Sequence, residues 1–212
     1  PCRPAPMHID PAAHSASHNY KLLTNIVVPR PIAWVTSCDV DGLVNLAPFS
    51  FFNAIGADPV LLMISVAHNA DGSLKHTGRN IVERGEFVVN LVTEELMDAM
   101  NISAAEFPDH ESELVAAGLA PAASARVAVP RVAAAKAALE CRLHSTLPFG
   151  NFTVIVGEVV MFHVDDALMG EKDRIHDFFP VGRMGSPSWY CRTDSRFEAP
   201  RVSYADLKPR PD

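Results

Sequence analysis

The sequence has no excess of basic residues, no paired cysteines and no long apolar segment. It has 18 Lys and Arg residues and 25 Asp and Glu residues, which gives a net charge of −7. It therefore lacks the excess of basic residues that displaces counterions from a nucleic acid. The four cysteines are scattered with no CxxC pair, which argues against a zinc knuckle and a dithiol redox pair. The longest largely apolar stretch, residues 60–67, is too short to span a bilayer, and the amino-terminal segment does not resemble a secretory signal. We therefore expect a cytoplasmic protein that binds neither nucleic acid nor membrane.

The common signatures of several enzyme classes are also missing. The chain contains no GxSxG, HExxH, GxxxxGK[ST] or GxGxxG motif, which argues against the usual hydrolase, zincin, P-loop and Rossmann classes. His14 and His18 have the spacing of helical metal ligands, and residues 109–111 combine acidic side chains with a histidine. A proline-flanked tail and a solvated loop explain these two groups more simply. We assign no metal site and no catalytic side chain.

The 17 prolines and 11 glycines divide the chain into short segments, most of which have the character of β-strands. β-branched, aromatic and other apolar residues over 31–46 are interrupted by turn residues at 39–42, which predicts a hairpin. Apolar and polar residues alternate over 139–144, and a turn at 148–151 leads into a long β-like segment at 152–164. We expect these last two segments to pair antiparallel.

Helices are predicted between the strands without regular alternation. One helix is expected from the turn at Asp71–Ser73 to a C-cap at Gly85, between strand-like runs at 60–66 and 87–92. The alanine-rich segment 133–138 favours a helix by propensity, but the alternation that follows it favours a strand. Two shorter helices are expected at residues 93–100 and 111–117.

Five to seven strands, mostly joined by turns, predict a mainly β fold with inserted helices. A closed or partly open barrel fits this order better than a doubly wound sheet. We expect an irregular tail at residues 1–18 and one domain at 19–212, with an irregular carboxy-terminal extension after Tyr190 that embraces a partner chain. Residues 1–6 precede Met7 and are set aside from the fold prediction.

A candidate anion site lies at the start of the predicted helix. Ser73, Lys75 and Thr77 add two hydroxyls and an ammonium to the free N–H groups and positive dipole of a helix amino terminus, which suits a phosphate. Arg79 and Asn80 follow one turn later. An ordinary capped helix is the alternative, because serine is a common N-cap residue.

The segment 45–53 is a second candidate site. Pro48 cannot donate to a sheet ladder, so it marks an edge or a break where small polar residues alternate with aromatic ones. Backbone N–H groups beside aromatic rings suit a flat heteroaromatic ligand edged with carbonyls and ring nitrogens. A proline-kinked core strand is the alternative on the pattern alone.

A series of short motifs runs in order over residues 20–190. The motifs are Tyr20-Lys-Leu-Leu, Pro29-Arg-Pro-Ile-Ala-Trp-Val-Thr-Ser37, Asp41-Gly-Leu-Val-Asn-Leu-Ala-Pro-Phe-Ser-Phe-Phe-Asn53, Lys75-His-Thr-x-x-Asn-Ile81, Glu86-Phe-Val-Val-Asn-Leu-Val92, Leu139-Glu-Cys141, Gly157-Glu-Val-Val160, and Gly182-Arg183 with Tyr190. Together they resemble the flavin reductase-like family of FMN-binding split barrels. One departure is His76, because the family pattern leads us to expect an aspartate between Lys75 and Thr77. The two flanking residues keep the expected phosphate contact, and the sequence does not indicate a role for the histidine.

The resemblance implies a Greek-key split β-barrel, usually a homodimer, with FMN near the subunit interface. It implies that Lys75, Thr77 and Asn80 contact the phosphate, with help from Arg30. The residues expected to line the ribityl chain and the isoalloxazine, largely through backbone groups, are Thr36, Ser37, Asn45, Ala47, Ser50, Phe51 and Asn53.

The implied activity is hydride transfer from NADH or NADPH to FMN, which supplies reduced flavin to a monooxygenase component or another acceptor. No protein nucleophile is required, because the cofactor carries the chemistry. One alternative is a flavoprotein that holds FMN tightly and acts as an electron carrier or a reductase of small organic substrates. Another is a non-catalytic FMN-binding protein. The sequence does not distinguish NADH from NADPH, identify the final acceptor or separate a released flavin from a prosthetic one.

Overall fold

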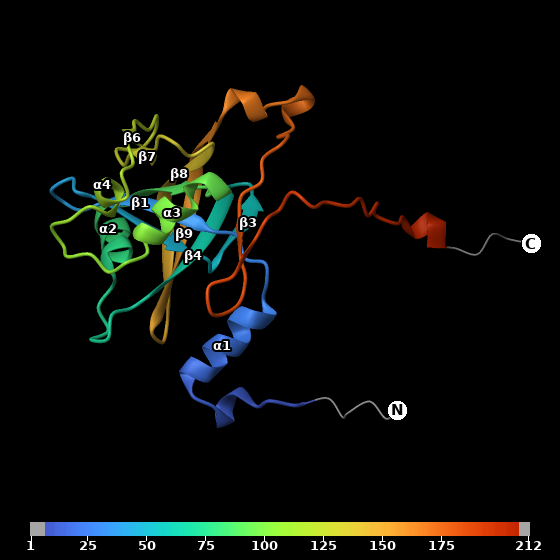
Figure 1. Cartoon of the computed structure of the whole chain (residues 1–212), viewed down its shortest axis with the longest axis horizontal. Helices are drawn as coiled ribbons and strands as arrows, with labels where there is room; N and C mark the ends of the chain where they lie inside the picture. The colour runs from blue at the N-terminus through green and yellow to red at the C-terminus, as the bar shows by residue number, and fades with distance from the viewer. Residues whose placement is uncertain (1–6, 208–212) are drawn as a thin grey trace, which may run out of the picture.

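The computed structural model describes residues 7–207 and centres on one antiparallel sheet (Figure 1). The remaining residues, 1–6 and 208–212, lie outside the described part, as do the expectations for them. Seven strands are arranged in the order β2-β1-β5-β8-β9-β4-β3, and every neighbouring pair is antiparallel. The predicted mainly β fold with inserted helices is therefore confirmed. The strands are β1 (Ala33–Cys38), β2 (Val44–Phe49), β3 (Phe52–Ala57), β4 (Val60–Ala67), β5 (Glu86–Asn90), β8 (Ala137–Phe149) and β9 (Phe152–Val164).

Both predicted hairpins form. Strands β1 and β2 pair with Ser37 opposite Asn45, and β2 is the outermost strand, so Pro48 occupies a sheet edge as expected. Strands β8 and β9 pair from Ala137 opposite Val164 to Phe149 opposite Phe152. The alanine-rich residues just before β8 form a turn and lead into this strand, as the alternation predicted.

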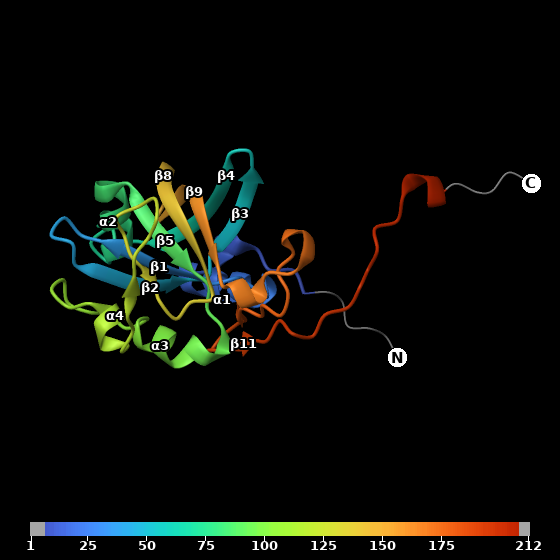
Figure 2. The same ribbon diagram turned by 90° about the horizontal axis from the view of Figure 1, so that it is seen from above.

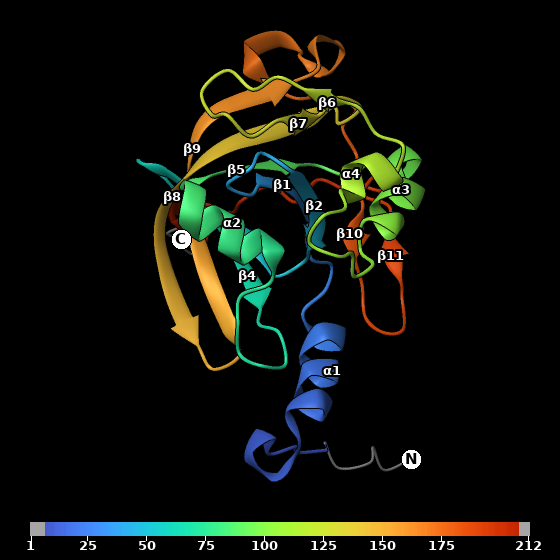
Figure 3. The same ribbon diagram turned by 90° about the vertical axis from the view of Figure 1, so that its left-hand side faces the viewer.

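Two small antiparallel strand pairs and several short helices complete the fold. Helices α3 and α4 lie beside the β10–β11 pair, while α2 lies across the sheet (Figure 3). The small strands are β6 (Pro121–Ala122), β7 (Arg131–Val132), β10 (Gly182–Arg183) and β11 (Tyr190–Cys191). The α-helices are α1 (Ala16–Ile26), α2 (His76–Arg84), α3 (Met97–Ile102) and α4 (Glu113–Ala116). Short 3-10 helices occur at Pro11–Ala13, Glu94–Leu96, Asp166–Leu168, Glu171–Asp173 and Tyr204–Leu207.

Helix α2 ends where the sequence predicts but begins later. Gly85 takes a left-handed conformation with φ of 72°, and its N–H donates to the Ile81 carbonyl at 2.8 Å, which is the expected C-cap. Ser73 lies outside the helix because the Asp71 carboxylate accepts its backbone N–H at 2.9 Å and holds a turn. The first helical residue is His76, with Lys75 at the N-cap.

Helix α1 occupies part of the region predicted to be an irregular tail. Ser15 caps it by accepting the His18 N–H at 3.2 Å, and only Thr24 of the helix is buried. The helix projects from the body of the molecule (Figures 1 and 3). The chain after β11 is largely without regular structure and runs away from the sheet (Figure 2). The expected carboxy-terminal extension and its contact with a partner chain stay predictions.

The core packs on both faces of the sheet. Period-two alternation in β1 sends Val35 to a cluster that includes Ile81 of α2, and sends Trp34 to a second cluster that includes Met100 of α3. The Trp34 indole N–H donates to the Ser103 hydroxyl at 2.8 Å, so its polar end is satisfied inside the core.

A buried carboxylate anchors one loop to the β8–β9 hairpin. Glu140 of β8 is fully buried, accepts backbone N–H groups from residues 125–127 and forms an ion pair with His163 of β9. Burial opposes ionisation, but these hydrogen bonds outweigh it and hold the pKa of Glu140 below its usual range. Glu140 and His163 therefore have a structural role in holding this loop.

Candidate functional site

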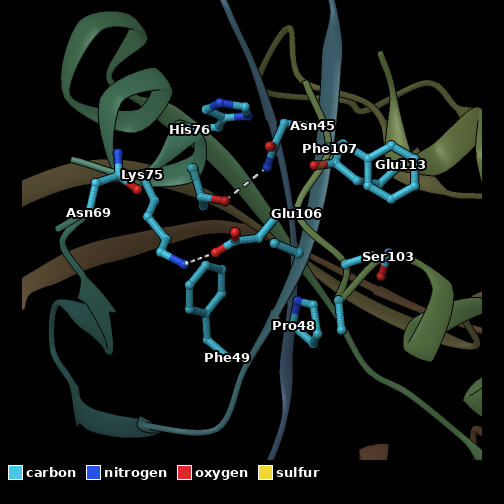
Figure 4. Close-up of a pocket in the computed structure, with 14 residues that line it drawn as sticks. Asn45, Pro48, Phe49, Asn69, Lys75, His76, Ser103, Glu106, Phe107 and Glu113 are labelled. Atoms are coloured by element: carbon cyan, nitrogen blue, oxygen red, sulfur yellow. Dashed lines mark hydrogen bonds and ion pairs between the residues drawn. The ribbon is translucent and has the colours of Figure 1, made fainter. Parts of the chain in front are cut away.

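The amino terminus of α2 faces a cavity of about 330 Å³ between this helix, β2 and residues 103–107 (Figure 4). Lys75 is the N-cap but makes no side-chain cap hydrogen bond, so the first-turn N–H groups lack that partner. Lys75, His76 and Thr77 all line the cavity. This end of the cavity thus combines a helix dipole, an ammonium, an imidazole and a hydroxyl, which suits an anion such as a phosphate.

Carboxylates of residues 106–109, here called the acidic segment, pair with the basic groups of α2. Glu106 Oε1 lies 3.2 Å from Lys75 Nζ, and Asp109 pairs with His76 at 2.8 Å and with Arg79 at 3.4 Å. The neighbouring His76, and then Arg79, hold the pKa of Asp109 below its usual range. Any phosphate bound by Lys75 competes with the Glu106 carboxylate for the same ammonium (Figure 4).

A buried polar network forms the deep wall of this cavity. The Asn45 amide lies 2.8 Å from Thr77 Oγ1. In the amide orientation that satisfies both its ends, its oxygen accepts the Thr77 hydroxyl and its nitrogen donates to Glu113 Oε1 at 3.1 Å. Burial raises the pKa of Glu113, whose other oxygen accepts the Leu46 N–H at 3.0 Å. The network connects α2, the edge strand β2 and α4.

Two backbone groups on the outer edge of β2, both before Pro48, form hydrogen bonds with side chains. The Leu46 N–H donates to Glu113, and the Val44 carbonyl accepts the Ser112 hydroxyl at 2.5 Å. Pro48 comes next on this edge and has no N–H to satisfy, which explains how a proline lies within the strand. Beyond the strand the chain turns into β3, where the backbone is free of the β1 ladder.

A second cavity of about 240 Å³ adjoins the first. Both are lined by Pro48, Phe49 and Ala104, so they lie on either side of the same stretch of β2. Residues from α1, the end of β2 and the β10–β11 segment complete the second cavity.

The structure divides the predicted site residues among several environments. The first cavity receives Asn45, Ala47, Lys75 and Thr77. Arg30 and Ser50 line the second cavity, where the Arg30 Nε donates to the Ser50 hydroxyl at 3.3 Å. Lys75 and Arg30 therefore do not lie in the same cavity.

The remaining predicted residues line neither of these two cavities. Asn80 is buried against Ser37, and its Oδ1 has no hydrogen-bond partner in the described residues. Thr36 is fully buried on the other face of β1, where its hydroxyl accepts the Asn90 amide at 3.3 Å. Because side chains alternate along a strand, those of Thr36 and Ser37 lie on opposite faces of the sheet, and a contact through their backbone groups stays a prediction. Phe51 packs between the rings of Tyr20 and Phe152, and Asn53 is exposed on β3.

Sequence reasoning missed Glu113 and Glu106, which both line the first cavity. Glu106 lies in the connection after α3 and Glu113 is the first residue of α4, and neither segment carries a motif that links it to β2 or α2. The pattern of charge alone gave no signal, because acidic residues in a loop are usually solvated. In residues 7–207 no three metal-ligating side chains gather into a cluster. No helix within that range has both the length and the apolar character needed to cross a membrane.

Comparison with known proteins gives a consistent result. A family model described as a flavin reductase like domain matches residues 26–183. The structure superposes on nitrilotriacetate monooxygenase component B from Bacillus cereus with a TM-score of 0.89 and 38% identity, covering 93% of this chain and 100% of that one. It superposes on 2-nitrobenzoate 2-nitroreductase from Pseudomonas fluorescens with a TM-score of 0.85 and 37% identity, covering 93% and 98% of the two chains.

A third solved structure identifies the type of fold. A split-barrel protein from Shewanella frigidimarina matches with a TM-score of 0.79 and 21% identity, covering 93% of this chain and 100% of that one. The split-barrel fold predicted from the resemblance is therefore confirmed. The family model spans all seven strands of the sheet and the whole lining of the first cavity, so the chain belongs to the flavin reductase-like family.

Proposed function

We propose that the protein is an FMN-dependent oxidoreductase that transfers hydride from NADH or NADPH to FMN. The reduced flavin, or its electrons, would then pass to an acceptor such as a monooxygenase component. The observation that carries this proposal is a single cavity that runs from the uncapped, cationic end of α2 to the edge strand β2. Such a cavity offers an anion site at one end, and the apolar surface of β2 at the other, to the two ends of one flavin nucleotide.

The residues at the α2 end fit the phosphate of FMN. The Lys75 ammonium and the first-turn N–H groups supply donors for the phosphate oxygens, which would share Lys75 with Glu106 or replace that carboxylate. Thr77 and Asn45 extend these polar groups along the cavity wall. Asn80 lies behind them, where its amide donates to the Ser37 hydroxyl at 3.3 Å.

The residues at the β2 end fit a planar ring. Ala47, Pro48 and Phe49 give the cavity an apolar wall, and Glu113 holds the β2 backbone in place from the opposite side. When bound, FMN supplies the hydride-accepting centre, which explains why the site needs no side-chain nucleophile. The protein's part is to hold the ring against β2 and to leave one face accessible to the nicotinamide.

The two similar solved structures suggest two uses of the same chemistry. One is component B of a nitrilotriacetate monooxygenase, and the other is a 2-nitrobenzoate 2-nitroreductase. For this chain, the first name favours delivery of reduced flavin to a monooxygenase, and the second favours a bound-flavin enzyme that reduces an organic substrate. We favour flavin delivery. The nitroreductase type of activity is kept as the second candidate because the two structures are almost equally similar to this chain, at 38% and 37% identity. A non-catalytic FMN-binding protein is the remaining alternative.

The test is a titration of the purified protein with FMN, followed by anaerobic addition of NADH or NADPH. We expect FMN to bind and its visible absorption to bleach with one of the two nicotinamides. Loss of the flavin on dilution supports the delivery role, and retention supports a bound-flavin reductase. Bound FMN that neither nicotinamide bleaches would contradict hydride transfer and leave a binding protein.

A further inference from the structure

The second cavity is lined by two guanidinium groups and by no carboxylate. Arg30 and Arg183 are its only charged lining residues within the described chain. Neither arginine forms an ion pair with any Asp or Glu there. This contrasts with the first cavity, where Lys75 is matched by Glu106.

Arg30 is fixed in place as a buried cation. It is 6% exposed, and its NH1 donates to the carbonyls of Thr24 and Val27, both at 2.7 Å. Its NH2 donates to the Met184 carbonyl at 3.1 Å. These neutral acceptors satisfy its hydrogen bonds but leave its charge without a counterion. Burial lowers the pKa of Arg30. The nearby Arg183 lowers it further, because the two guanidinium groups repel each other.

Arg183 is the more adaptable of the two. Its guanidinium lies 4.7 Å from the centre of the Tyr190 ring, and its NH2 donates only a long bond of 3.4 Å to the Pro187 carbonyl. An arginine stacked on an aromatic ring keeps its fork of donors free for a planar anion. Tyr20 and Phe49 supply further aromatic surface around the same space.

We propose that this cavity binds the anionic group of the second ligand, next to the flavin on β2. The inference rests on the proposed function, because Pro48, Phe49 and Ala104 are shared with the cavity assigned to FMN. An anion between Arg30 and Arg183 neutralises the charge of a buried and of a half-buried guanidinium. A ring attached to that anion then lies along the wall that the two cavities share. The anion is either the carboxylate of a planar organic acid or a phosphate of the nicotinamide dinucleotide.

The test measures anion binding to the flavin-free protein by calorimetry, with benzoate and inorganic pyrophosphate as the probes. We expect at least one of them to bind, and Arg183→Gln to weaken that binding about tenfold or more, as for loss of a bidentate charge-assisted contact. Arg142→Gln, an exposed arginine on β8, is the matched control and should leave it unchanged. Benzoate dependence identifies a carboxylate ligand, and pyrophosphate dependence identifies a phosphate ligand.

Arg183→Lys provides a second variant in case the first does not fold. It keeps the charge but loses the fork, so we expect an intermediate weakening. Binding of both probes that is insensitive to both substitutions overturns the proposal, because it places the anions elsewhere, for example at Lys75. An equal loss of FMN affinity in Arg183→Gln also overturns it, by assigning Arg183 to the flavin.

The two proposals fail in different ways. If the wild-type protein does not bind FMN, the proposed function fails, while the flavin-free titration still reports on the arginine cavity. If FMN binds and is reduced but neither anion depends on Arg183, only the present inference fails.

Discussion

At the scale of single residues, Lys75 gives the most direct test of the phosphate end. We expect Lys75→Ala to weaken FMN binding by about 1 kcal/mol, roughly fivefold, at the low end for a charge-assisted hydrogen bond. The low value follows because the Lys75 side chain is 42% exposed and already shares its charge with Glu106, so solvent screens it. A fluorescence titration with FMN measures the change.

The matched control is Lys136→Ala, which removes a lysine in the turn before β8. It should leave the FMN affinity unchanged, and both variants should keep the melting temperature of the parent. A folded Lys75→Ala protein with the parent's affinity would exclude Lys75 from the site.

Glu113 predicts a pH-dependent effect on stability. Burial raises its folded-state pKa above the unfolded value, so its contribution to stability falls as pH rises through the unfolded and then the folded pKa. Glu113→Gln removes the buried charge, and the Asn45 amide can turn to pair with the new side chain. We therefore expect the variant to melt a few degrees above the parent at pH 8 and close to it at pH 4.

Thermal unfolding followed by circular dichroism across this pH range measures the difference. Glu158→Gln, an exposed position on β9, should show no such pH dependence. A lower melting temperature for Glu113→Gln at pH 8 would mean that the Leu46 and Asn45 hydrogen bonds outweigh the cost of burying the charge.

Sequence reasoning chose site residues by type and could not fix their orientation. Lys75 and Thr77 could be predicted because their chemistry and spacing mark a helix amino terminus, wherever that helix packs. The face on which Thr36 or Ser37 lies depends on the register between β1 and its neighbours, which one strand alone does not specify. Arg30 lies beside the second cavity because α1 and residues 183–186 fold around it, and these contacts are distant in sequence.

At the scale of elements, turn residues and short sequence patterns predicted those features that depend on neighbouring residues alone. The turn at 148–151 and the alternation before it specify the β8–β9 hairpin, and Gly85 specifies the end of α2. The amino end of α2 was predicted too early, because the Asp71 turn competes with the helix for Ser73. Helix α1 was missed because the proline-flanked segment before it favoured an irregular tail.

The acidic segment should act as a competitor for the phosphate. We expect Glu106→Gln to strengthen FMN binding about two- to fivefold. The substitution frees the Lys75 ammonium from its ion pair and removes a negative charge that would repel the phosphate. The gain should shrink as salt is raised from 20 to 500 mM, since Glu106 is exposed and its field is screened (roughly 10 Å Debye length at 0.1 M). FMN titrations at the two salt concentrations measure the effect.

Glu111→Gln is the control for this element, because Glu111 belongs to the same connection but its carboxylate lies 3.9 Å from His110 and forms no ion pair with Lys75 in the described residues. It should not change the affinity. Weaker FMN binding in Glu106→Gln would instead mean that Glu106 positions Lys75 for the phosphate.

At the scale of the whole molecule, the β8–β9 hairpin leaves an open edge. Strand β8 pairs with β5 only as far as Arg142, and beyond Leu143 it bonds to β9 alone. This half of the strand carries the exposed apolar side chains of Leu147 and Phe149. Exposed strand edges with apolar residues pair readily with another chain, and a second copy of this chain is the simplest partner.

We therefore predict a homodimer in solution and expect the double variant Leu147→Asp, Phe149→Asp to be monomeric. Sedimentation equilibrium at micromolar concentration measures the mass of each. Val115→Asp is the matched control, because Val115 is a 72% exposed apolar residue on α4, away from the hairpin, and should leave the dimer intact. If FMN lies near the interface, the monomeric variant should also lose FMN affinity while keeping its secondary structure. A wild-type monomer would contradict the prediction, and would require one chain alone to complete the flavin site.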